Sequence, residues 1–99
     1  MAILKSDSNV LNETGQRLGV GTAYLHLPHG LDREQEGTGT ISLRSWEPTD
    51  APPAELRLED GRRLAIRVSR DALSECSRNR VLRFTLRWPP AGAVADPSG

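Results

Sequence analysis

The sequence predicts a small, mainly β domain, built as a five-stranded barrel with one short helix before the last strand. Apolar and polar side chains alternate in several short runs, the period-2 pattern of strands with one buried face. Proline- and glycine-rich connections separate these runs, and a single segment changes to helical spacing. With 99 residues, of which 36% are hydrophobic, the chain can form one domain with a modest core.

Two strands are predicted in the N-terminal half. Residues 1–16 begin with a short apolar stretch and could form an arm or an edge strand. Residues 17–27 alternate clearly and form the first strand, which Pro28 ends because proline cannot donate to a ladder. Residues 28–38 are a polar, acidic loop, and 39–46 form the second strand before a proline-broken connection.

A β-hairpin is predicted over residues 55–68, where two alternating runs flank Asp60-Gly61. A two-residue loop would place Leu58 opposite Arg63, on the wrong face. A three-residue loop over 60–62, with Gly61 at positive φ, keeps Leu58 near Leu64 and the apolar rows together.

The segment 69–78 changes to helical spacing. Ser69 or Asp71 could cap one to two turns of helix, because either side-chain oxygen can accept from a free backbone N–H. Residues 80–88 then alternate as the last strand. We expect eight side chains of the hairpin and last strand to share the core: Leu56, Leu58, Leu64, Ile66, Val68, Leu82, Phe84 and Leu86.

A closed sheet would hide the edges of these five short strands and enclose their apolar rows. The connection lengths resemble those of an SH3-like barrel, in which a tight hairpin and a single helical turn precede the final strand. An OB-type barrel fits less well, because its helix usually lies between the third and fourth strands. The barrel domain is expected to span residues 17–90, with residues 91–99 as a disordered tail.

The charged residues are balanced in number and unevenly distributed. Thirteen basic and 13 acidic residues give a formal net charge of zero, which argues against a general polyanion binder. Residues 55–88 carry nine arginines against five acids, whereas residues 1–54 are net acidic. Twelve of the bases are arginines, as a GC-rich genome favours, although arginine also pairs well with carboxylate and phosphate.

Five arginines of the predicted hairpin and last strand lie on the face opposite the apolar rows: Arg57, Arg63, Arg67, Arg83 and Arg87. If the three strands pair, these side chains share one outer face. Three interpretations stay open: a solvated face with weak ion pairs, a docking face for a protein partner, or a weak nucleic-acid site. Aromatic residues for base stacking are scarce, so protein docking is favoured over nucleic acid.

No enzyme motif or metal-site spacing is present, so we expect a non-enzymatic domain with neither catalytic residues nor cofactors. His26 and His29 near Asp32 lack the fourth ligand of a structural zinc site, and Cys76 has no nearby base to activate it. One cysteine cannot form an internal disulfide, no apolar run approaches membrane-spanning length, and the N-terminus does not resemble a secretory signal. We therefore expect a cytoplasmic protein that does not bind membranes.

Overall fold

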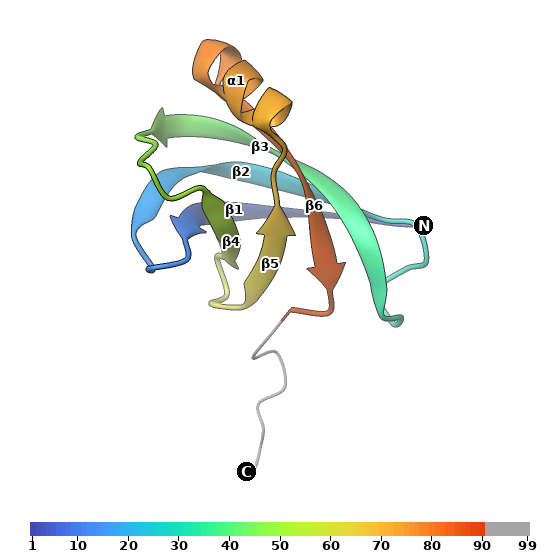
Figure 1. The fold of residues 1–99 in the computed structure, drawn as a ribbon. Helices are drawn as coiled ribbons and strands as arrows, with labels where there is room; N and C mark the ends of the chain where they lie inside the picture. The colour runs from blue at the N-terminus through green and yellow to red at the C-terminus, as the bar shows by residue number, and fades with distance from the viewer. Residues whose placement is uncertain (91–99) are drawn as a thin grey trace.

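The computed structural model describes residues 1–90 and contains a closed, entirely antiparallel barrel (Figure 1). Its strand order is β1-β2-β3-β6-β5-β4. The elements are β1 (Ala2–Asn12), β2 (Arg17–Leu27), β3 (Gln35–Trp46), β4 (Pro53–Leu58), β5 (Arg63–Arg67), α1 (Arg70–Asn79) and β6 (Val81–Trp88). The mainly β barrel with a short helix before the last strand is confirmed. The SH3-like relationship stays a prediction, and the expected tail lies outside the described residues.

The barrel has six strands rather than five, because the N-terminal segment forms a full strand. β1 pairs with β2 along its length and with β4 over Ser8–Asn12, so it closes the barrel and is neither an arm nor an edge strand there. The alternation of apolar and polar residues did not predict this strand, because two of its inward positions are serines. Both are buried and bonded: Ser8 Oγ donates to Ser6 O (3.1 Å), and Glu59 N donates to Ser6 Oγ (3.2 Å).

Strand β3 begins at Gln35, four residues earlier than predicted. Its extra residues include Gly37, and the predicted part begins with Gly39; both are inward positions without the apolar side chain that would reveal them. Gly39 pairs with Phe84 of β6, and a Cβ at Gly39 would lie 2.6 Å from two atoms of the Phe84 ring. The ring therefore fills the space that a side chain at position 39 would need.

The hairpin between β4 and β5 has the predicted odd-length turn. Leu56 lies opposite Leu64, Leu58 N donates to Arg62 O (2.8 Å), and Gly61 has a φ of 91°. The three-residue loop is Glu59-Asp60-Gly61, one residue earlier than predicted. This register keeps both apolar rows inside the barrel.

The core fills the barrel and extends to α1. Seven of the eight predicted core residues are buried, and the eighth, Val68, packs against them while half-buried. Ser69 is the N-cap, since its Oγ accepts from Ala72 N (3.1 Å), and Ala72 and Cys76 form the buried face of the helix. Figure 1 shows α1 at one end of the barrel, above the ends of β3 and β6. Neither α1 nor any other helix within residues 1–90 could cross a bilayer.

Candidate functional site

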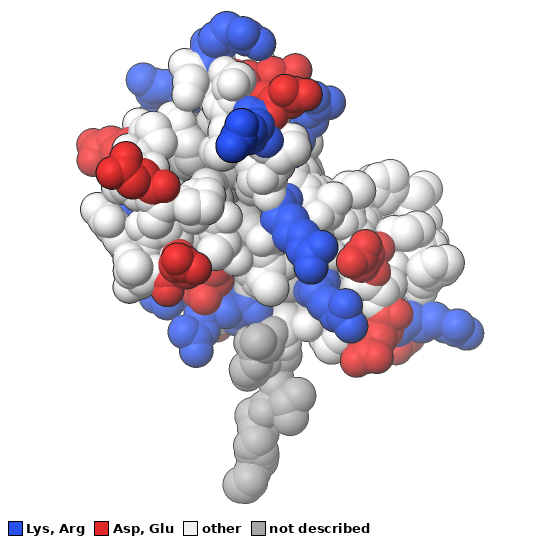
Figure 2. Space-filling view, in the orientation of Figure 1, with Lys and Arg blue, Asp and Glu red and all other residues white. Residues whose placement is uncertain are grey.

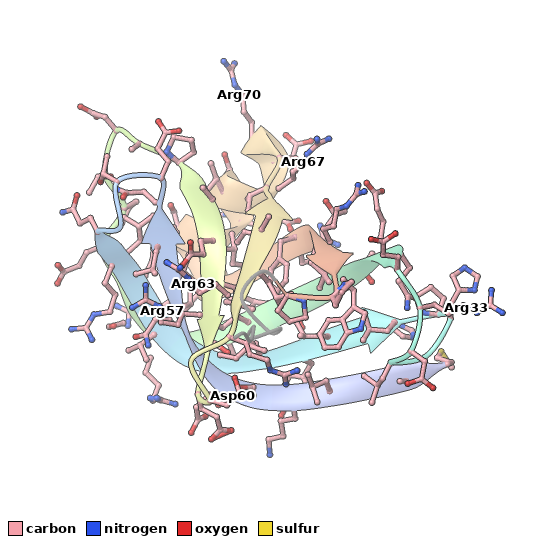
Figure 3. The ribbon with its side chains drawn as sticks, turned by 90° about the horizontal axis from the view of Figure 1, so that it is seen from below. Arg33, Arg57, Asp60, Arg63, Arg67 and Arg70 are labelled. Carbon is pink, nitrogen blue, oxygen red and sulfur yellow. The ribbon has the colours of Figure 1, made fainter. Side chains whose placement is uncertain are left out.

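The five predicted arginines come from three neighbouring strands, because β5 pairs with β4 on one side and β6 on the other. All five are exposed on the outside of the barrel, but they do not form one patch. Arg57 lies opposite Arg63, whereas Arg67 lies opposite Thr85, between the β6 positions of Arg83 and Arg87. Figure 3 shows Arg57 and Arg63 close together and Arg67 well apart from them. The predicted face is therefore two basic regions.

Ion pairs occupy only some of these arginines. Arg83 Nη2 lies 2.7 Å from Glu75 Oε1 of α1, and Arg57 Nη2 lies 3.7 Å from Glu55 Oε2. Among residues 1–90, no carboxylate oxygen lies within 4.0 Å of the Arg63, Arg67 or Arg87 guanidinium. Exposed ion pairs are weak, about 0–1 kcal/mol, so a competing anion could displace Glu75 from Arg83.

A groove of about 860 Å³ lies on the outer surface of β2, β3 and β6. At one end it is bordered by Ile3, Tyr24 and His26, and its middle includes Thr38, Thr40 and Thr85. The other end is formed by Arg67, Arg83 and the first turn of α1. Within residues 1–90, no carboxylate is among the lining side chains. Figure 2 shows a band of basic side chains crossing the middle of the visible face, over β6. Arg57, Arg63 and Arg87 do not border this groove.

The sheet register arranges the groove residues in two rows that cross the strands. Each row starts at an apolar or aromatic side chain, continues through threonine and ends at arginine. The first row is Ile3, His26, Thr38, Thr85 and Arg67, and the second is Tyr24, Thr40 and Arg83. The groove therefore has an apolar and aromatic end and a basic end.

At the apolar end of the groove, two large side chains are exposed to solvent. Ile3 is 67% exposed and Tyr24 is 44% exposed, although large apolar side chains are usually buried. Lys5 Nζ lies 5.9 Å from the centroid of the Tyr24 ring, within cation–π range. The sequence pattern did not predict that Tyr24 and His26 share a groove with Arg67. Extending the 39–46 alternation back to residue 36 would have placed Thr38 on the face of Arg44, opposite Ile41 and Leu43.

The residues considered for metal binding or nucleophilic chemistry are not brought together. His26 projects from β2, whereas His29 lies in the β2–β3 loop, where its backbone N donates to Gln35 Oε1 (2.8 Å). In the part of the chain that the structure describes, no three His, Cys, Asp or Glu side chains form a group that could hold a metal. Cys76 is fully buried, and burial raises the pKa of its thiol, which disfavours the nucleophilic thiolate.

Compared with protein-family models, curated proteins and solved structures, the chain matches none of them.

Proposed function

We propose that this chain is a non-enzymatic interaction domain that binds an acidic segment of a partner protein in the groove over β2, β3 and β6. The observation that carries the proposal is the groove lining, in which Arg67 and Arg83 lie at one end. Among residues 1–90, Glu75 beside Arg83 is the one carboxylate within 4.0 Å of either guanidinium. The absence of a carboxylate near Arg67 within residues 1–90 leaves its guanidinium free to form a two-pronged pair with a partner. A cytoplasmic location and an SH3-like relationship accompany this proposal as expectations from the sequence.

Protein docking suits the charge distribution better than a long polyanion does. The net charge of the chain is zero, so the field of Arg67 and Arg83 is local and falls off within a Debye length of about 8 Å at physiological salt. A short acidic segment can contact the groove alone. A long nucleic acid would also meet acidic side chains such as Glu34 and Glu36, which are exposed around the start of β3.

The test is a fluorescence-anisotropy titration with a labelled decapeptide of alternating Glu and Asp, and with a matched Lys decapeptide. The acidic peptide should bind and the Lys peptide should not. An Arg67→Glu, Arg83→Glu double variant should lose the binding. The matched control is Arg57→Glu, Arg63→Glu, which changes the net charge equally outside the groove and should retain most of it. Equal losses in both double variants would mean general electrostatic attraction and would refute a groove site.

Single-stranded nucleic acid is the alternative ligand for the same groove. The observation that favours it is the pair of outward rings on β2, Tyr24 and His26, which line the same groove as Arg67 and Arg83. Bases could stack on these rings while Arg67 and Arg83 contact phosphates.

A further inference from the structure

We infer that the groove takes an extended peptide that lies across the strands, with an apolar side chain at the Ile3–Tyr24 end and a carboxylate at Arg67. This inference rests on the proposed function and specifies the partner segment it requires. It predicts both the two anchor types and the spacing between them, neither of which follows from the basic charge alone.

The direction of the peptide follows from the register. His26 pairs with Thr38, Thr38 with Thr85, and Thr85 with Arg67, so these four positions form one line across β2, β3, β6 and β5. Neighbouring strands lie about 4.8 Å apart, which makes the line about 14 Å long. An extended chain advances about 3.3 Å per residue, so an anchor over β2, the strand of Tyr24, should lie about four residues from the one at Arg67, and an anchor that reaches Ile3 on β1 about six.

The middle of the groove can accept a peptide backbone. The side chains there are threonines, which are short, and the hydroxyls of the exposed Thr38 and Thr85 can donate to and accept from backbone groups. The larger outward-facing side chains that line the groove lie at its two ends, which is the arrangement that a two-anchor ligand requires.

The charges at the two ends define what each end binds. Arg83 is already paired with Glu75, whereas Arg67 has no carboxylate within 4.0 Å among residues 1–90, so Arg67 is the main contact for the acidic residue. At the other end, Ile3 and Tyr24 are the large exposed apolar side chains that border the groove. Lys5 Nζ lies 5.9 Å from the centroid of the Tyr24 ring, so a positive charge also lies at this end and would attract an acidic peptide.

The test uses three synthetic peptides with the same N-terminal fluorophore. The spaced peptide is Trp-Ser-Gly-Ser-Glu-Asp, the shuffled peptide Ser-Gly-Ser-Trp-Glu-Asp has the same composition, and the third replaces Trp by Ala in the spaced order. The spaced peptide should bind at least about fivefold more tightly than the other two, a difference of about 1 kcal/mol. Tyr24→Ala and Ile3→Ser should each lower its affinity toward that of the Ala peptide.

Two outcomes separate this inference from the proposed function. If all three peptides bind equally and Arg67→Glu abolishes binding, the acidic site stands and the two-anchor peptide is wrong. If none of them binds, both proposals are wrong. A single-stranded oligonucleotide that displaces the spaced peptide at lower concentration than the peptide's own Kd would also overturn the inference, because the groove would then prefer phosphate and bases. Circular dichroism and the Tm of each variant establish that the fold is intact.

Discussion

Arg67 and Arg83 are chemically identical side chains in different electrostatic surroundings. The carboxylate of Glu75 lies 2.7 Å from Arg83, so part of its charge is already satisfied within the domain. Arg67 lies one strand away without such a partner in residues 1–90. A sequence pattern could place both arginines on the same outer face, but it could not show that a helical residue eight positions earlier would pair with one of them.

Removing the competing carboxylate should strengthen acidic-peptide binding. In Glu75→Gln the Arg83 guanidinium is released, and because exposed pairs are worth about 0.2–1 kcal/mol, the Kd should fall by up to about fivefold. Anisotropy titration with the Glu-Asp decapeptide measures the change. Asp71→Asn is the matched control, since it removes one negative charge from the same helix without breaking an ion pair within residues 1–90. Equal gains in both variants would contradict a specific role of Glu75.

The Phe84 ring, on the neighbouring strand, leaves no room for a side chain larger than glycine at position 39. A Cβ at this position would lie 2.6 Å from the Phe84 ring and 3.1 Å from Tyr24 O, so Gly39→Ala must displace a buried aromatic side chain. We expect a loss of about 1–3 kcal/mol in the free energy of unfolding, typical of overpacking. Thr38→Ala, on the outer face, should change it by less than about 0.5 kcal/mol. Urea denaturation of the two variants gives the comparison, and a Gly39→Ala protein as stable as wild type would contradict the packing.

At the scale of elements, the sequence predicted the strands whose inward residues are large and apolar. β4, β5 and β6 carry leucine, isoleucine or phenylalanine at most of their inward positions, and their pairing and hairpin register followed from that alternation. β1 and the start of β3 use serine and glycine at inward positions, which a hydrophobic pattern does not reveal. These two segments supply Ile3 and Thr38, so the groove could not be assembled from the sequence.

The β4–β5 turn contains a carboxylate with a perturbed pKa. Arg62 N donates to Asp60 Oδ1 (3.0 Å) and Arg62 Nε to Oδ2 (2.7 Å), so the pKa of Asp60 lies below its ordinary value of 3.8, chiefly through the backbone donor. A carboxyl whose pKa is lower in the folded state stabilises the fold above its unfolded-state pKa. That contribution is lost as the pH falls through the lowered value.

We therefore expect the difference in Tm between wild type and Asp60→Asn to depend on pH. The Tm difference between the two proteins should be constant near neutral pH and change only below about pH 4, where Asp60 becomes protonated. An NMR titration of the Asp60 carboxyl should give a pKa below 3.8 in wild type. In Arg62→Ala the pKa should rise only in part, because the backbone donor remains. A wild-type pKa of 3.8 or higher would contradict the observed hydrogen bonds.

At the scale of the whole molecule, strand pairing determines which charges lie side by side. Arg63 pairs with Arg57 of β4, and Arg67, four residues further along β5, pairs with Thr85 of β6, so the Arg57–Arg63 region lies apart from the groove. The sequence predicted a basic C-terminal half and an acidic N-terminal half, and both halves are present in one barrel. The pairing of β3 with β6 interleaves them, since Glu36 lies opposite Arg87 in the register. Neither the split of the arginines nor this interleaving follows from alternation within single strands.

This interleaving predicts weak binding to oligonucleotides. A strand long enough to leave the groove would approach Glu36 and the exposed Asp32 and Glu34, so only a few phosphate contacts are favourable. Titration of labelled single- and double-stranded oligonucleotides at physiological salt should therefore give no sub-micromolar Kd. Any residual affinity should fall as salt rises, with a slope set by the few phosphates neutralised. Sub-micromolar binding that is lost in Arg67→Glu, Arg83→Glu and kept in Arg57→Glu, Arg63→Glu, with both variants folded by circular dichroism, would establish nucleic acid as the groove's ligand.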